Sequence, residues 1–210
     1  MQTSKLLDAK SAMTFRKWHV DHGPSEWKIT DVWAEIDDAI DKNEIRTSAG
    51  QLRNYLEYLS AEWCARLGGR VEYHSDGRYE LGDLLPAAIG AMNDLYKKAK
   101  VAAQSWNDKA CVDELGKMHA AFSKATVATN IEQWQVNRVV HYDEWANLQK
   151  EDFAPLVAAF KNLEVCFACD KCGDLLYVVR AGGQKEGVRC ACSAVNLNLN
   201  AKPKEDKAAA

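Results

Sequence analysis

The stretch that decides the fold is CFACDKCGDLLYVVRAGGQKEGVRCAC, residues 166–192. It holds five of the seven cysteines of the 210-residue chain. Four of them form two pairs separated by 17 residues: Cys169 and Cys172, then Cys190 and Cys192. Two thiolates in one tight turn can bind one metal ion, and Gly173 permits that turn after the first pair. The interval between the pairs is close to that of a zinc ribbon.

These four thiolates predict a closed Zn²⁺ site. Four protein ligands complete a tetrahedral coordination sphere and leave no position for water, so the predicted zinc is structural and not catalytic. Between the pairs, the apolar run 175–179 predicts a strand, the glycines at 182–183 a turn, and residues 188–189 the start of a return strand. The predicted ribbon occupies residues 166–200.

Three features of this stretch differ from the usual ribbon. The second pair is Cys-x-Cys instead of Cys-x-x-Cys, and Ser193 follows it where a glycine is usual. Cys166 precedes the first pair with the same two-residue gap, so it is an alternative to one of the four ligands. A further alternative to metal binding is a cluster of free thiols packed against the rest of the protein.

Upstream of the cysteines, apolar residues recur at helical spacing. Helices are predicted over residues 32–40, 48–67, 83–106, 108–126, 139–148 and 153–163. Ser48 is the predicted N-cap of the second helix, and a polar break is expected near Asn130. A β-hairpin is predicted over residues 71–81, because Asp76-Gly77 is a favoured tight-turn pair.

The expected fold is therefore mainly α: a helical bundle with a small β-hairpin and a C-terminal zinc ribbon. The bundle is expected over residues 31–165, after an N-terminal segment that covers residues 1–30. Residues 201–210, rich in lysine and alanine, are expected to be a disordered tail.

Composition limits the function classes. Hydrophobic residues make up 47% and charged residues 27%, which is typical of a soluble globular protein. A net charge of -3 excludes nucleic-acid binding driven by the charge of the whole chain, so such binding needs a local patch. No apolar run is long enough to span a membrane, and residues 1–10 lack the core of a signal peptide. We therefore expect a cytoplasmic protein, in which clustered cysteines favour metal over disulfides.

Lysines gather at one point of the predicted long helix. Lys97, Lys98 and Lys100 lie opposite its apolar face, where they are candidates for contact with nucleic-acid phosphates. The alternative is an ordinary solvated helix face. Elsewhere no phosphate-binding loop of the form G-x-x-x-x-G-K-[ST] occurs, which argues against ATP hydrolysis by this chain alone.

A second polar group is a candidate for catalysis. His141 and Glu144 would share a helix face, and a histidine beside a carboxylate can transfer protons near neutral pH. With Arg138 they resemble an incomplete site of a helical HEPN-type ribonuclease. Val136 stands where the arginine of that motif is expected, and a structural, hydrogen-bonded histidine is the alternative.

Several longer strings resemble one family. They are LRNYLEY at 52–58, ELGDLLPA at 80–87, KKAK at 97–100, VVHY at 139–142 and NLNL at 196–199. Together they resemble the C-terminal region of large bacterial SMC/AAA-type ATPases, which occur among DNA-maintenance and anti-phage systems. The resemblance covers about residues 15–200. It implies an accessory domain that acts with an ATPase head, which this chain lacks.

The function that these observations favour is a non-catalytic interaction module stiffened by zinc. Its expected partner is a protein, with an ATPase as the candidate, or a nucleic acid. The alternative is a helical ribonuclease or toxin-like effector that uses His141.

Overall fold

The computed structural model describes the backbone of residues 15–19, 23–26, 29–140 and 149–203, and side chains within 32–129 and 149–203. Its helices are α1 (Ile29–Asp41), α2 (Ile45–Leu67), α3 (Leu81–Ser105), α4 (Lys109–Val140) and α5 (Lys150–Val165). Its strands are β1 (Phe15–His19), β2 (Gly23–Glu26), β3 (Tyr177–Ala181), β4 (Gln184–Arg189) and β5 (Asn196–Asn198). The protein is thus mainly helical, and the predicted fold class is confirmed.

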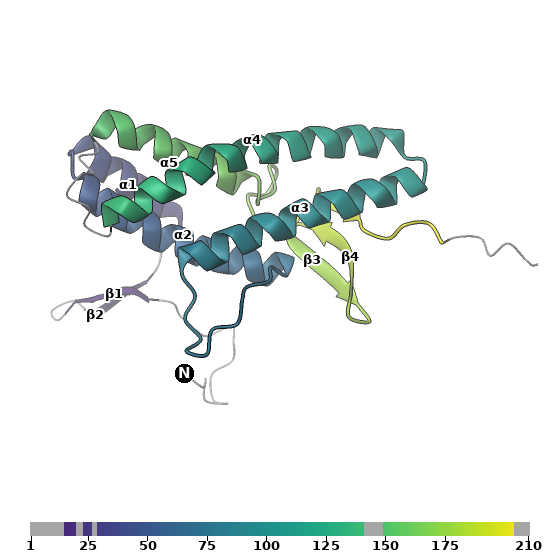
Figure 1. The fold of residues 1–210 in the computed structure, drawn as a ribbon, viewed down its shortest axis with the longest axis horizontal. Helices are drawn as coiled ribbons and strands as arrows, with labels where there is room; N and C mark the ends of the chain where they lie inside the picture. Colours follow the sequence, from purple (N-terminus) through teal and green to yellow (C-terminus); the bar gives the residue numbers. More distant parts are fainter. Residues whose placement is uncertain (1–14, 20–22, 27–28, 141–148, 204–210) are drawn as a thin grey trace, which may run out of the picture.

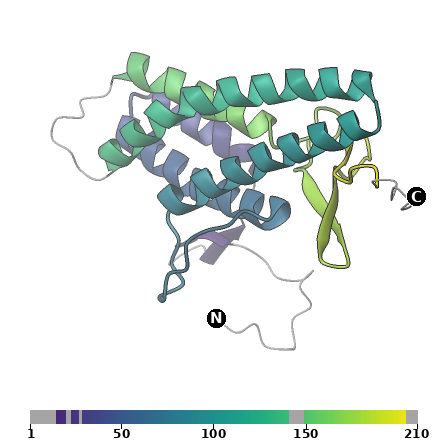
Figure 2. The same ribbon diagram turned by 45° about the vertical axis from the view of Figure 1, so that its right-hand side comes forward.

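The helices form an elongated bundle with the small sheet at one end (Figure 1). α3 and α4 run side by side, and β3 and β4 lie on the other side of α3 from α4. The sheet is antiparallel in the order β3-β4-β5, with Val188 paired to Val178 on one side and to Leu197 on the other. Figure 2 shows the β3–β4 hairpin extending below the end of the bundle.

One hydrophobic core joins the helices to the sheet. The apolar stripe of α2 is buried from Leu52 to Leu67, because a 3.6-residue period places these side chains on one face. The same core contains four apolar residues of the cysteine-rich segment: Phe167, Leu176, Val188 and Leu199. The sheet therefore shares the hydrophobic core of the bundle.

The C-terminus of α2 meets this sheet. Gly68 adopts a left-handed conformation with φ 71°, and the N–H groups of Gly68 and Gly69 both donate to the Cys64 carbonyl at 2.8 Å. The ammonium of Lys185 in β4 donates to the Leu67 carbonyl at 3.0 Å. A cation at this helix end also complements the helix dipole.

The hairpin predicted over residues 71–81 is wrong. Every one of these residues is described, and none lies in a strand. The turn itself forms, since Gly77 N–H donates to the His74 carbonyl at 3.0 Å. Tyr73, however, is 82% exposed, so its apolar ring packs against little of the protein. A two-stranded hairpin without such packing is marginal in water.

Two helix boundaries also differ from the prediction. α2 begins at Ile45, and the hydroxyl of Ser48 donates to the Ile36 carbonyl at 3.1 Å instead of capping the helix. α4 continues through Asn130 to Val140. The hydroxyls of Thr126 and Thr129 donate to the carbonyls of Phe122 and Thr126, respectively, so these polar residues are accommodated within the helix.

Candidate metal centre

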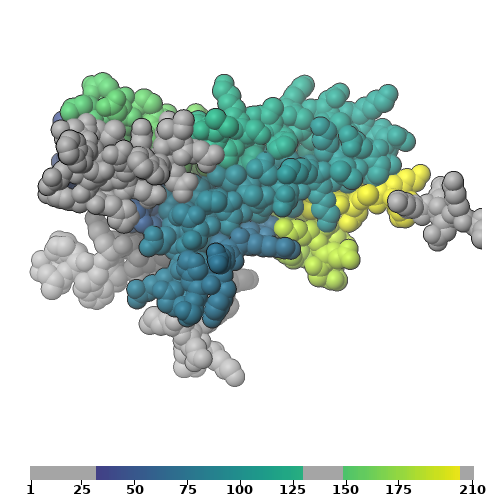
Figure 3. All heavy atoms as spheres, viewed as in Figure 1, coloured from purple at the N-terminus to yellow at the C-terminus, as the bar shows by residue number. Residues whose placement is uncertain are grey.

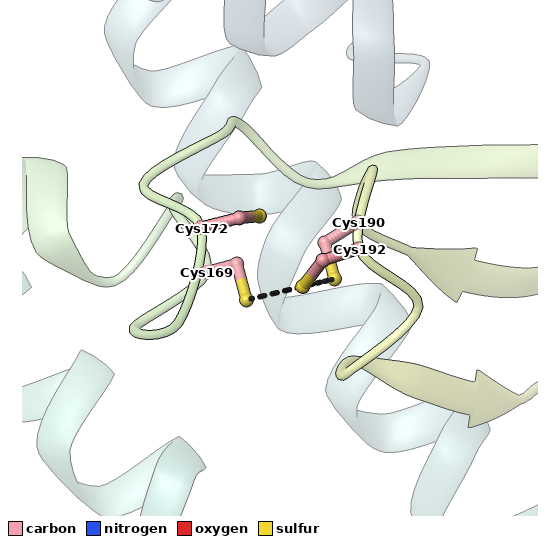
Figure 4. A group of neighbouring side chains, drawn as sticks. All are labelled: Cys169, Cys172, Cys190 and Cys192. Atoms are coloured by element: carbon pink, nitrogen blue, oxygen red, sulfur yellow. Dashed lines mark hydrogen bonds between the residues drawn. The ribbon is translucent and has the colours of Figure 1, made fainter.

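The sulfur atoms of the four paired cysteines converge in one place, from the turn before β3 and the turn after β4 (Figure 4). All four Sγ atoms lie within 4.8 Å of one another. Cys192 Sγ is 3.8 Å from Cys169 Sγ and 3.5 Å from Cys190 Sγ. A tetrahedral ion with metal–sulfur bonds of about 2.3 Å holds its sulfur atoms about 3.8 Å apart. This group could therefore hold one metal ion.

The first pair is presented by a tight turn that the backbone closes. Gly173 N–H donates to the Cys169 carbonyl at 2.8 Å, and Cys169 N–H donates to the Asp174 carbonyl at 2.9 Å. Gly173 has φ 72°, a left-handed conformation that favours glycine. The sequence expectation for Gly173 is thus confirmed.

The second pair lies in a turn whose amides face the sulfur of Cys190. Val195 N–H donates to this sulfur at 3.1 Å. That hydrogen bond is the largest of several contacts, with Cys192 and Cys169 among the others, that lower the pKa of the Cys190 thiol below its usual value, because they stabilise the thiolate. A thiolate is the form that binds metal, so the turn prepares Cys190 as a ligand near neutral pH.

Cys166 is not a member of the group. It follows the last turn of α5, and its thiol donates to the Asn162 carbonyl at 3.4 Å. Burial raises the pKa of this thiol, which is the opposite of what a ligand needs. All seven cysteines lie in the described part of the chain, and none forms a disulfide.

An aromatic cluster fixes the site to the helices. Phe167 lies between Cys166 and the first cysteine pair. Its ring stacks on Trp63 of α2 with centroids 4.0 Å apart and an interplanar angle of 6°. Phe122 of α4 meets Phe167 edge-on at 5.5 Å. Cys169 and Cys190 are 2% and 1% exposed, within the same core. A metal here would stabilise the core and not only a surface loop.

Ser193 provides a direct test of the second turn. Its φ is 60°, and this left-handed conformation costs a non-glycine residue about 1–2 kcal/mol. Glycine would not pay this cost, but the larger chain entropy of glycine in the unfolded state would cancel part of the gain in stability. We expect Ser193→Gly to raise the free energy of unfolding by about 0.5–1 kcal/mol in chemical denaturation. Ser193→Ala keeps the Cβ atom and serves as the control; an equal gain in that variant would refute the explanation.

The predicted phosphate-binding lysines are exposed on α3. Lys97 lies 4.0 Å from Asp94 within the same helix, and Lys100 points to solvent. Lys98 differs, because its ammonium donates to the Lys185 carbonyl of β4 at 3.2 Å. The structure therefore brings one of the three lysines beside the cysteine-bearing sheet.

The candidate catalytic group lies largely outside the described residues. His141 and Glu144 fall in the gap between α4 and α5, and Arg138 belongs to the part of α4 in which only the backbone is described. The geometry of an acid–base site at these residues is therefore untested, and the effector hypothesis stays a prediction.

A cleft that sequence patterns did not indicate lies between α2, the end of α5 and the first cysteine turn. Its volume is about 410 Å³, and Tyr58, Glu62, Asp174 and Tyr177 are among its lining residues. Glu164 also lines it, but its carboxylate accepts hydrogen bonds from Tyr55 and Trp33, so it acts as a link between helices.

Comparisons with known proteins give no relative from which to take a function: no family model, no curated protein and no solved structure matches the chain. The resemblance to the C-terminal region of SMC/AAA-type ATPases therefore stays a prediction. Within the part of the chain that the structure describes, no helix is both long and apolar enough to cross a membrane.

Proposed function

We propose that the protein is a non-catalytic, zinc-stabilised interaction module that binds nucleic acid. The observation that carries this proposal is the group of four cysteines, which could hold one metal ion and of which Cys169 and Cys190 belong to the core shared by the sheet and the helices. Four protein thiolates fill a tetrahedral coordination sphere, and a filled sphere supports a structural role. The sheet between and after the two cysteine pairs places basic side chains next to those of α3.

Zinc is the ion that we propose for the four cysteines. Thiolates are soft ligands, and tetrahedral sites of four thiolates hold zinc or iron. The spacing of the two pairs, close to that of zinc ribbons, supports zinc.

Elemental analysis of the purified protein is expected to give one zinc per chain. Removing it with a chelator should lower the melting temperature, because the binding free energy of a structural metal is part of the folding free energy. Recovery of the melting temperature on adding zinc back is the control for irreversible damage. Iron at one per chain, or no bound metal after purification under reducing conditions, would contradict the zinc assignment.

Nucleic acid is the proposed partner because its phosphates match exposed lysines on a protein that is otherwise weakly acidic. Lys97, Lys98 and Lys100 are all exposed on one helix, and the net charge of -3 requires any phosphate binding to be local. Binding to short labelled DNA and RNA, followed by fluorescence anisotropy, tests this proposal. The affinity should fall steeply as the salt concentration rises. No binding at low salt would reject the proposal.

We also propose that the protein is cytoplasmic and that it acts with a protein partner. The resemblance to the accessory region of SMC/AAA-type ATPases supports a partner ATPase and a role in DNA maintenance or anti-phage defence. Native mass spectrometry after co-expression with the genomic neighbours tests this part. A stoichiometric complex with an ATPase is the expected result, and a protein that stays alone in every co-expression would reject the partner.

A further inference from the structure

Four basic side chains from separate segments meet where the sheet contacts the helices. They are Arg70 after α2, Lys98 on α3, Arg180 on β3 and Lys185 on β4, and we call them the basic junction. Figure 3 shows the β3–β4 hairpin lying directly against the helical part of the protein. Arg70, Arg180 and Lys98 are exposed, and Lys185 is half-buried.

Specific contacts fix the basic junction. Lys98 donates to the carbonyl of Lys185, and the ammonium of Lys185 in turn donates to the carbonyl of Leu67 at 3.0 Å. The guanidinium of Arg180 lies against Gly68, where a Cβ atom would collide with its Nη2. A glycine at this position thus permits both the left-handed end of α2 and the approach of Arg180.

Within the described residues, the cations of the basic junction have no direct carboxylate partner, although the charge of Asp94 acts on Lys185. Among the described residues, none of its four members forms an ion pair with an acidic side chain. Burial lowers the pKa of Lys185, and the positive charges of Arg180, Arg70 and Lys98 lower it further; Asp94 acts in the opposite direction. Like charges that are held close together, and that Asp94 offsets only in part, are stabilised by a bound anion.

We propose that the basic junction is the phosphate-binding surface for nucleic acid, and that it exists only when the cysteine-bearing ribbon is folded against the bundle. This inference rests on the proposed function and names its surface. Two of the four cations, Arg180 and Lys185, belong to the strands that lie between the two cysteine pairs. A ligand that contacts all four cations therefore binds only when the ribbon is folded against the bundle.

The test neutralises three members of the basic junction together: Arg70→Gln, Lys98→Gln and Arg180→Gln. Lys185 is left intact because it caps α2. The matched control carries Lys109→Gln, Lys117→Gln and Lys124→Gln, which remove the same charge from exposed positions of α4. Affinity for labelled mixed-sequence duplex DNA, single-stranded DNA and RNA is measured by anisotropy across a salt series, with metal content and circular dichroism as checks of folding.

The expected result is a smaller salt dependence for the basic-junction variant alone. Each phosphate contact contributes about 0.9 to the slope of log affinity against log salt on duplex DNA, so three lost contacts lower it by about 2.7. If wild type binds and both variants keep its slope, the surface is wrong although the proposed function stands. If wild type binds no nucleic acid, the proposed function fails as well. If the wild type binds polyglutamate instead of nucleic acid, and only the basic-junction variant loses that binding, the surface belongs to an acidic protein partner and the inference is overturned.

Discussion

A Cys190→Ser variant is expected to lose its bound metal and to unfold at a much lower temperature than the wild type. Cys190 is 1% exposed, and its sulfur both faces the other thiolates and accepts the Val195 N–H. A structural zinc contributes about 10–16 kcal/mol of apparent binding free energy in small zinc-binding peptides. That range is similar to or greater than the total stability of an ordinary domain, about 5–15 kcal/mol. Metal per chain and the thermal unfolding midpoint are the two measurements.

Cys166→Ser is the matched control for this variant. It makes the same chemical change in the same segment, but the Cys166 thiol contacts the Asn162 carbonyl and lies outside the four-sulfur group. We expect this variant to keep one metal per chain and to unfold close to the wild-type temperature. Loss of the metal from Cys166→Ser, with retention in Cys190→Ser, would mean that the ligand assignment is wrong.

Phe167→Ala is expected to lower the free energy of unfolding by about 3–5 kcal/mol, the usual range for deleting a buried phenylalanine ring. Phe167 is 1% exposed and packs against both Trp63 and Phe122. Its loss would leave a cavity between the helices and the first cysteine turn. Denaturant titration of the metal-loaded protein, followed by tryptophan fluorescence and circular dichroism, measures the change.

Tyr73→Ala is the control for the loss of an aromatic ring. Tyr73 is 82% exposed, so its removal is expected to change stability by no more than about 0.5 kcal/mol. Phe167→Ala should still bind one metal per chain, because the four thiolates are unchanged. A loss below about 1 kcal/mol in Phe167→Ala would show that the ring does not couple the ribbon to the bundle.

The parts of the fold that the sequence predicts well depend on local spacing. The cysteine pairs converge as predicted, because two short turns suffice to present two thiolates each. The apolar stripes of α2, α3 and α5 are also local signals, since residues three and four apart share a helix face. Among these helices, the errors concern the ends more than the existence of each element.

The errors arise where distant residues decide the outcome. Serine is a favoured N-cap residue, but the Ser48 hydroxyl donates its hydrogen bond to the Ile36 carbonyl of the neighbouring helix α1. The hairpin around Gly77 has the correct turn and lacks a surface on which to pack. The contact of Lys98 with Lys185 joins residues 87 positions apart, and no periodicity reports such a pair. The strand β5 was not predicted for the same reason, because it is defined by its pairing with β4.

The position of Phe167 late in the chain has a consequence for biosynthesis. Its ring covers Trp63, yet the ribosome makes α2 long before it makes the cysteine turns that hold Phe167 in place. At about 5–20 residues per second, this apolar face stays uncovered for on the order of ten seconds during each round of translation. A nascent chain in that state is exposed to aggregation and to chaperones until the last cysteine emerges. We therefore expect the yield of folded molecules to depend on the supply of metal at that moment, and not only in the finished protein.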